Sequence, residues 1–238
     1  MTDAAGLWSY LTTEPLWWLS CTIVGYLLAD RVARMAGRHA LANPVLMAVC
    51  LMAAIIWLSG TSYQTYFEGA QFIHFLLGPA TVALAVPLHA NLPAIRKYAA
   101  PMLAALVAGS LAAVLSAVLL SQAFGLPEAI VISISPKSTT APVAIGISET
   151  LGGLPTLTAV LVIVTGIIGA VVVTPLMNAL HIRDWRARGF AVGIAAHGIG
   201  TARAFQVNEV AGAFAGIGLA LNAILTSLLV PLVVAILV

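Results

Sequence analysis

The chain carries almost no charge over its middle third. Between Tyr98 and Ile182, the only charged residues are Glu128, Lys137 and Glu149. Over all 238 residues, 61% are hydrophobic and 8% are charged, whereas a soluble domain carries about 25% charged residues. A chain this poor in charge cannot cover a water-facing surface, so we predict an integral membrane protein. The apolar runs are long and do not alternate, which favours helices over barrel strands.

Apolar segments along the chain predict an all-α polytopic fold. A helix needs about 20 residues to cross the hydrocarbon core, and most segments meet that length, the second only just. We expect about eight segments within a single transmembrane domain, 1–238, that lies in the lipid bilayer. Their approximate bounds are 7–29, 43–60, 71–90, 99–122, 128–149, 154–180, 189–207 and 210–238.

Three basic clusters set the expected orientation, because positively charged loops favour the cytoplasmic side. If 128–149 enters and leaves the membrane on one face, all three clusters are cytoplasmic and the N-terminus is outside. If that segment instead crosses fully, with a break at its centre, the third cluster lies opposite the other two. We favour the re-entrant arrangement and keep the broken crossing as the alternative. The clusters are Arg31, Arg34 and Arg38; Arg96 and Lys97; and Arg183, Arg186 and Arg188.

The stretch ISISPKSTTAPVAIG, residues 132–146, is unusual for a membrane helix. Pro136 and Pro142 each remove a backbone donor and obstruct a continuous helix. Non-helical backbone at membrane depth survives only inside protein or against water. We therefore predict a helix break that exposes one cation and three hydroxyls to a cavity. These candidate binding residues are Lys137, Ser138, Thr139 and Thr140.

A second discontinuity is predicted around 193–207, where glycines weaken the helix and polar residues stand at membrane depth. A central arginine costs about 2.5–3.5 kcal/mol on insertion scales. His197 and Thr201 are four residues apart and share a helical face, and Arg203 points close enough to line the same cavity. The candidate binding residues here are His197, Gly198, Gly200, Thr201 and Arg203.

A faint internal repeat connects this discontinuity to an earlier one. GPATVALAV, from Gly78, aligns with GIGTARAFQ, from Gly198. In the favoured orientation, the segments around the two stretches run with opposite polarity. That pattern predicts an inverted repeat, with halves of about 1–125 and 126–238, and such repeats place the substrate site at their interface. Gly78 and Pro79 are then a further expected helix break.

Each singled-out residue also has a purely structural interpretation. Lys137 could extend to the membrane surface or pair with a glutamate. Arg203 could pair with Glu209 across a helix end, and His197 could be a packing histidine with its hydrogen bonds satisfied. Two glycine pairs predict close helix packing, namely Gly166 with Gly169 and Gly212 with Gly216.

Enzymatic motifs are missing from the sequence. It has no G-x-S-x-G, S-x-x-K or H-E-x-x-H motif and no paired intramembrane aspartates. No basic tract suggests nucleic acid, and no motif suggests a nucleotide or a metal. Cys21 and Cys50 stand inside apolar runs, which is typical of small buried hydrophobes. We therefore expect neither an enzyme, nor a cofactor, nor a nucleic-acid partner.

Three stretches resemble the signature sequences of the LrgB/CidB family. They are FLLGPATVALAVPL (75–88), SPKSTTAPVAIGISETLGG (135–153) and AAHGIGTARAFQVNEVAGAFAG (195–216). The resemblance covers essentially the whole chain. It implies a membrane protein of the bacterial cytoplasmic (inner) membrane, either a carrier or a holin-like or antiholin-like regulator of murein hydrolase export and autolysis.

The resemblance also implies a substrate class and a partner. The family includes the C-terminal half of the plant plastidal glycolate/glycerate translocator, and some bacterial members act in pyruvate uptake with a small LrgA/CidA-like protein. The implied substrates are 2-hydroxy and 2-keto monocarboxylates such as glycolate, glycerate, lactate and pyruvate. Lys137, Arg203 and the nearby hydroxyls suit such a molecule, because arginine grips a carboxylate through two hydrogen bonds and lysine serves as a point charge. A homo-oligomer is expected, and His197 or Glu209 is the candidate for proton coupling.

Overall fold

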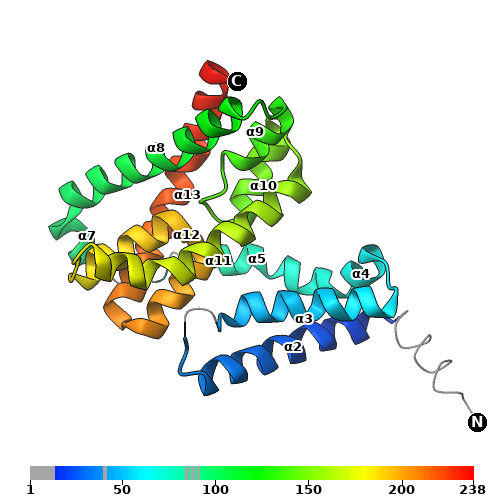
Figure 1. The fold of residues 1–238 in the computed structure, drawn as a ribbon. Helices are drawn as coiled ribbons and strands as arrows, with labels where there is room; N and C mark the ends of the chain where they lie inside the picture. Colours follow the sequence, from blue (N-terminus) through cyan, green and yellow to red (C-terminus); the bar gives the residue numbers. More distant parts are fainter. Residues whose placement is uncertain (1–13, 40–41, 84–85, 87–88, 90–91) are drawn as a thin grey trace, which may run out of the picture. The chain divides into compact units, whose positions relative to one another are not determined.

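The computed structural model describes residues 14–39, 42–83, 86, 89 and 92–238, which fold almost entirely into α-helices (Figure 1). No strand occurs within those ranges. The predicted all-α class is therefore confirmed for the described residues, and the count of eight segments stays a prediction. The chain forms two compact units, Met1–Ala80 and Thr81–Val238, and each is described by itself. The predicted repeat halves, which divide at a different point, also stay a prediction.

The first unit contains α2 (Pro15–Met35), α3 (Pro44–Ser59) and α4 (Tyr63–Phe75). Prolines occupy the first turns of α2 and α3, where a backbone N–H would lack a helical partner anyway. The Asn43 side chain caps α3 by accepting hydrogen bonds from two backbone N–H groups. Helix α2 contacts both α3 and α4. Its Trp18 is fully buried and meets Tyr66 edge-on, with ring centroids 5.8 Å apart.

The predicted segment 71–90 is not one continuous helix. Helix α4 ends, Leu76 is a turn residue, and α5 follows as Leu77–Ala83. Gly78 and Pro79 stand in the first turn of α5, a position where proline is tolerated, so the interruption falls just before them. The far end of this segment, like the beginning of the first predicted segment, lies outside the described residues.

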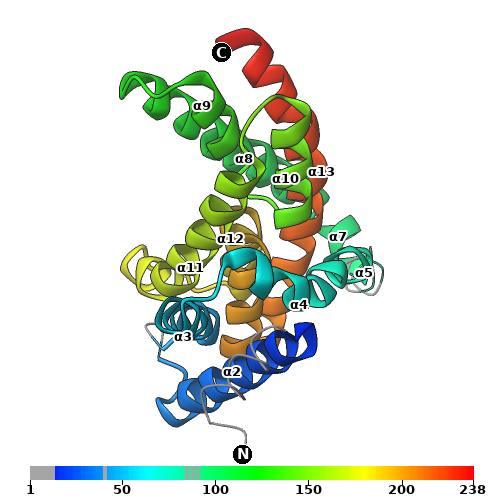
Figure 2. The ribbon, with the colours of Figure 1, turned by 90° about the vertical axis from the view of Figure 1, so that its right-hand side faces the viewer.

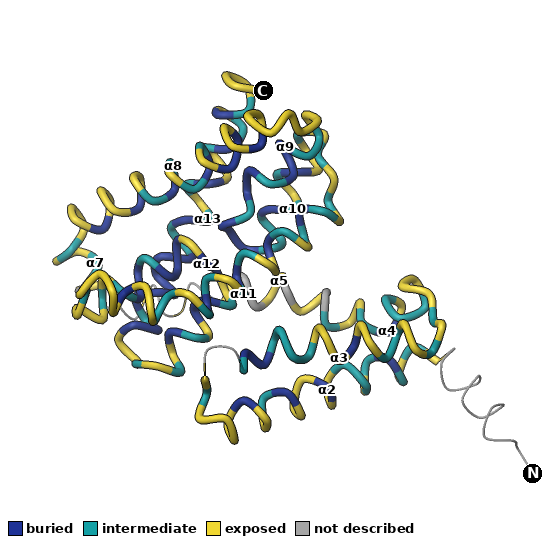
Figure 3. Tube along the Cα trace, viewed as in Figure 1, coloured by how far each residue is buried: buried dark blue, intermediate teal, exposed yellow. Residues whose placement is uncertain are grey.

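The second unit holds the long apolar helices. Among the described residues, α8, α11 and α13 are long and apolar enough to cross a membrane, and α3 is apolar but shorter. Large apolar side chains such as Leu103, Ile168 and Leu228 are exposed on them, as on a surface that faces lipid. Exposed positions recur along α8 in Figure 3. The elements are α7 (Leu92–Lys97), α8 (Ala99–Ala123), α9 (Glu128–Ile134), α10 (Ala141–Thr150), α11 (Pro155–Ala179), α12 (Trp185–Val207) and α13 (Glu209–Leu237).

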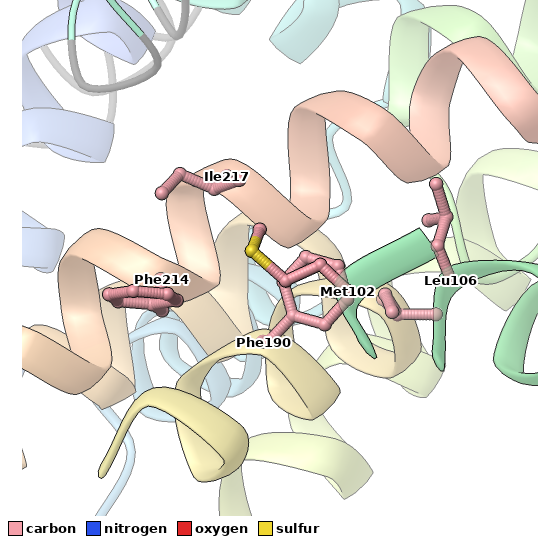
Figure 4. Packing of buried hydrophobic residues seen from close by; sticks show 6 residues of the cluster. Met102, Leu106, Phe190, Phe214 and Ile217 are labelled. Atoms are coloured by element: carbon pink, nitrogen blue, oxygen red, sulfur yellow. The ribbon is translucent and has the colours of Figure 1, made fainter. Parts of the chain in front are cut away.

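Small residues bring α12 and α13 into close contact. A Cβ on Gly189 would lie 2.0 Å from the carbonyl oxygen of Ala211, and a Cβ on Gly193 would lie 2.0 Å from that of Ala215. Backbones this close leave room only for glycine. Helix α8 packs over this pair and completes an apolar cluster (Figure 4) that includes Met102, Leu106, Phe190, Phe214 and Ile217.

The predicted break in 128–149 is confirmed, because α9 and α10 are separate short helices. The Thr158 hydroxyl, at the start of α11, lies 3.1 Å from the Ser133 carbonyl oxygen and 2.7 Å from Ser148 Oγ, so it ties the two helices together. In Figure 2, α9 lies beside α8 and α10 beside α13. Both short helices pack against the C-terminal halves of α8 and α13, in a cluster with Val118, Val131, Ile147, Leu151 and Val230.

The turn between α9 and α10 reaches further along the long helices. The Lys137 ammonium donates to the carbonyl of Ala113, near the middle of α8. The Ser138 carbonyl accepts from Asn222, near the middle of α13. The segment is therefore a hairpin: both of its outer ends lie at one end of the unit, and its turn lies at mid-length.

The second and third basic clusters meet at the opposite end of the unit. The Arg186 guanidinium carbon lies 4.6 Å from the centre of the Tyr98 ring, and Lys97 Nζ lies 5.5 Å from the same point. Arg186 also donates to the Tyr98 hydroxyl. Helices α8 and α11 are therefore antiparallel and connect the same two ends of the unit. This follows because the α9–α10 hairpin, which lies between them in the chain, returns to the end from which it starts.

Candidate functional site

The first break spans residues 135–140, between α9 and α10. In a continuous helix, the residue at position 136 would donate its N–H to the carbonyl of Ile132, and Pro136 has no N–H to give. The Ser135 hydroxyl donates to that carbonyl instead, at 2.8 Å. Pro142 stands in the first turn of α10, where it starts the new helix. The chain leaves the helix at one proline and resumes it at the other.

Lys137 is partly buried at the turn of the hairpin. Its ammonium donates to the Ala113 carbonyl at 3.3 Å. Within the described part of the chain, it makes no ion pair with a carboxylate. An ammonium has three protons to donate, so a lysine held by one backbone carbonyl keeps capacity for an anionic ligand.

Two threonine hydroxyls beside the lysine are buried without partners. Thr139 is fully buried and Thr140 is 7% exposed, and neither Oγ1 has a hydrogen-bond partner among the described residues. Burying an unsatisfied hydroxyl costs about 1–3 kcal/mol. Ser138 is buried as well. The break therefore collects a cation and unused hydroxyls, which is the chemistry that a small oxygen-rich anion requires.

A cavity of about 560 Å³ leads to this break from the opposite end of the unit. Ser138 and Ala113 line its inner part, and Tyr98 and Arg186 line its outer part. Of the four residues predicted to face a cavity at this break, Ser138 lines it, whereas Lys137, Thr139 and Thr140 are not in its lining. Met102, Phe190, Ile194 and Phe214 of the apolar cluster form part of its walls. At the outer end, hydrogen bonds from Arg186 lower the pKa of Asp184 to about 2, so this pair stays ionised and nearly neutral overall.

The second break is confirmed as a kink inside α12. Ala196 (φ −131°) and His197 (φ 40°, ψ −137°) have non-helical backbone torsions. His197 is 4% exposed, and its Nε2 donates to the Val162 carbonyl at 2.8 Å. The Thr201 hydroxyl donates to the His197 carbonyl, also at 2.8 Å. Unlike Thr139, Thr201 uses its hydroxyl internally.

Glycines of α11 make room for the kink, as the Gly166 and Gly169 pair predicts. A Cβ on Gly166 would lie 2.5 Å from Cε1 of the His197 ring, and one on Gly169 would lie 2.3 Å from the Ala196 Cβ. The histidine ring therefore fills a slot that the bare glycine backbone creates. This arrangement matches the packing interpretation of His197.

The remaining predicted residues lie apart from the first break. Arg203 lines a separate small cavity of about 30 Å³ with Arg188 and Trp185, and it donates to Gln206 Oε1 at 3.5 Å. Gly198 is exposed with open space around it, whereas Gly200 is buried. Glu209 is exposed in the first turn of α13. Lys137 does not line this cavity and contacts Ala113 of α8 instead, so the structure does not bring together the two cations expected to share a substrate.

Asn222 on α13 was not singled out by sequence reasoning. It is 1% exposed, and its amide donates to the Ser138 carbonyl at 3.2 Å and to the Ile194 carbonyl at 3.1 Å. The only signal in the sequence is that 210–238 contains a single asparagine in a run whose other polar residues are Thr226 and Ser227. Nothing in that run indicates that its partners lie on two other segments.

The apolar long helices and the two buried breaks define the class of the molecule, an α-helical integral membrane protein with discontinuous helices. A sequence model of the LrgB-like family matches residues 22–236. The chain therefore belongs to the LrgB family, as the three signature stretches predict.

Relatives cover most of the chain. The uncharacterized protein YxaC of Bacillus subtilis is 37% identical over 80% of this chain and 83% of its own length. The uncharacterized protein YwbG of the same bacterium is 33% identical over 90% and 94%. The holin-like protein CidB of Staphylococcus aureus is 32% identical over 90% and 93%. No solved structure gives a significant match to the chain.

Proposed function

We propose that this chain is a secondary transporter of small 2-hydroxy and 2-keto monocarboxylates, of the glycolate, glycerate, lactate and pyruvate class, and that it binds them at the first break. The single observation that carries the proposal is the partly buried Lys137 beside the buried Thr139 and Thr140. The ammonium has spare donors and the two threonine hydroxyls have no partner. A carboxylate would pair with the ammonium, and a neighbouring hydroxyl or keto oxygen would accept from a threonine.

The route to this site is the cavity between α8 and α12. It is lined by Arg186 at its outer part and by Ser138 at its inner part. An open path to mid-depth on one side, with the hairpin closing the other side, is the arrangement that alternating access requires. We propose that the hairpin is re-entrant, that the repeat of 1–125 and 126–238 is inverted, and that Arg203 and the second break belong to the moving part.

Sidedness tests this route. Because Lys97 and Arg186 both lie near Tyr98, single cysteines at 97 and 186, in a chain without Cys21 and Cys50, should be labelled from the same side, the cytoplasm. A third cysteine at Arg38 should behave like them. Labelling of position 97 from one side and position 186 from the other would contradict the re-entrant hairpin.

The direct test is uptake of labelled glycolate and pyruvate into proteoliposomes. The proposal expects saturable uptake that excess unlabelled monocarboxylate inhibits, and uptake no faster than that of empty vesicles would sink it. Parallel vesicles containing an LrgA/CidA-like protein show whether that proposed partner is required. We place the working protein in the bacterial cytoplasmic membrane as a homo-oligomer, and crosslinking in native membranes tests that arrangement.

Proton coupling is proposed to run through His197 or Glu209. His197 is buried at the kink, and Glu209 is an exposed carboxylate at the start of α13. Histidine is the side chain whose ordinary titration range is closest to physiological pH. His197→Gln and Glu209→Gln are each measured for uptake between pH 5.5 and 8. If both variants keep the parental pH profile, neither residue is the coupling group.

A second candidate is a holin-like or antiholin-like role in murein hydrolase export and autolysis, and the names of the staphylococcal relatives favour it. Such a protein would act through assembly and would need no carboxylate site. A strain that lacks this protein separates the two candidates when it is complemented with the parent or with Lys137→Gln. A carrier loses monocarboxylate uptake with Lys137→Gln, whereas a pure regulator of lysis keeps its effect on autolysis.

A further inference from the structure

Asn222 is a buried side chain of the second unit that is not part of the proposed binding group, and it takes part in four hydrogen bonds. Its Oδ1 accepts from the Ser110 hydroxyl at 2.7 Å and from the Thr226 hydroxyl at 3.1 Å. Its Nδ2 donates to the carbonyls of Ser138 and Ile194. An amide has two N–H donors and one carbonyl oxygen with two lone pairs, so each of its hydrogen-bonding positions is in use.

Both carbonyl partners belong to the breaks. Ser138 lies in the non-helical stretch between α9 and α10. Ile194 lies two residues before Ala196, so the kink separates its carbonyl from the N–H of residue 198 that a regular helix would supply. A carbonyl left without a donor at this depth is costly. The Asn222 amide supplies one donor to each break from a third helix.

We propose that Asn222 is a positioning residue that holds the two breaks together as one mechanical unit. The two protons of Nδ2 lie on one planar group, so the Ser138 and Ile194 carbonyls cannot move apart without losing one of the two hydrogen bonds. A consequence that rests on the proposed function is that carboxylate binding displaces the first break, and the Asn222 link transmits this displacement to the kink at His197. Ser110 and Thr226 fix the plane of the amide through its oxygen.

The first experiment needs no ligand. Amide hydrogen exchange is measured on the full chain in lipid nanodiscs for the parent, Asn222→Leu and Thr226→Val. Asn222→Leu removes both donors at similar size, and we expect exchange at 135–140 and at 193–200 to rise together by about tenfold or more, with α2 unchanged. Thr226→Val removes one of the two hydrogen bonds to the Asn222 oxygen but leaves both donors, so it should raise exchange at the two breaks much less than Asn222→Leu does.

Asn222→Ala repeats the test in case the leucine variant does not fold, since it also removes both donors and introduces neither a charge nor a new hydrogen-bonding group. A rise at one break only, a uniform rise over the whole chain, or an equal effect of Thr226→Val would overturn the proposal. Each of these results would make Asn222 a local or general packing residue.

The second experiment adds glycolate or pyruvate. In the parent, both breaks should become protected from exchange, whereas in Asn222→Leu protection should be confined to 135–140. Protection of 193–200 that persists in Asn222→Leu would also overturn the proposal. If neither carboxylate protects any segment of the parent, the proposed substrate class fails, and the ligand-free comparison still decides the role of Asn222.

Discussion

The two breaks of the second unit solve the same backbone problem in opposite ways. At the first break, Pro136 ends the helix and the neighbouring hydroxyls of Thr139 and Thr140 remain buried and unpaired. At the second break, a residue with positive φ bends the helix, and its side chain and its carbonyl are both hydrogen-bonded. The first break leaves two hydroxyls without a partner, whereas the second pairs both the ring Nε2 and the backbone carbonyl of its central histidine.

This difference suggests that the first break binds a ligand and that the second break only bends its helix. Unpaired buried hydroxyls weaken a fold unless something else occupies them, since each costs about 1–3 kcal/mol. A kink whose polar groups are hydrogen-bonded, and which packs against glycines, is stable without a ligand. We therefore assign ligand contact to the first break and treat the kink at His197 as the point where α12 changes direction.

The largest expected effect comes from removing the charge at the first break. Lys137→Gln should lower affinity for glycolate or pyruvate by roughly 10–100-fold, because a hydrogen bond to a charged group contributes about 1.5–3 kcal/mol. Lys137→Arg should also be impaired, since a planar fork does not replace a compact ammonium. Calorimetry on the purified variants measures both. Lys97→Gln, the exposed lysine, is the matched control, and unchanged affinity in Lys137→Gln would return Lys137 to a structural role.

The next effect comes from filling the slot behind the kink. Gly166→Ala places a Cβ 2.5 Å from the His197 ring, and overpacking of this kind costs about 1–3 kcal/mol. Gly146→Ala is the control, because a Cβ there has nothing within 4 Å. Thermal unfolding in detergent should show a clear loss for Gly166→Ala and none for Gly146→Ala. Equal melting temperatures would mean that the kink is not supported by α11.

A pair of threonine substitutions should give effects of opposite sign. Thr201→Val removes the hydrogen bond to the His197 carbonyl and should destabilise the protein by roughly 0.5–1.5 kcal/mol, with affinity nearly kept. Thr139→Val removes an unpaired hydroxyl, so stability should stay level or rise while carboxylate affinity falls. Unfolding and binding are measured on both variants. The distinction between the breaks collapses if Thr139→Val binds normally or if Thr201→Val is the variant that loses binding.

The smallest effect is expected at the outer end of the cavity. Because Arg186 holds the pKa of Asp184 at about 2, below its ordinary 3.8, the stability from their pairing is complete above the ordinary value and is lost only as pH falls through about 2. Melting temperature between pH 5 and 8 should therefore be indifferent to this pair. Asp184→Ala also removes the cap of α12 and should cost about 1 kcal/mol, whereas Asp184→Asn should cost less. A pH-dependent difference between parent and Asp184→Asn within that range would contradict the assignment.

Much of the architecture was predictable from local chemistry. The scarcity of charge between Tyr98 and Ile182 determines a membrane protein, since lipid is the one solvent that such a surface tolerates. Pro136 determines a helix break because it lacks the N–H that would pair with the carbonyl four residues earlier, and its ring clashes with that carbonyl. The clustering of glycines likewise indicates where helices meet closely.

Other features required the tertiary structure, because the deciding partner is a backbone group on a distant segment. The Val162 carbonyl satisfies His197, Arg203 faces a cavity apart from Lys137, and Asn222 reaches both breaks. Backbone carbonyls are the same at every position of the sequence, so no residue pattern indicates which of them a side chain will meet. The sequence by itself determined that the helices break and what chemistry stands at each break, and only the packing of α8, α11 and α13 around them decided which polar groups are satisfied and which remain free for a ligand.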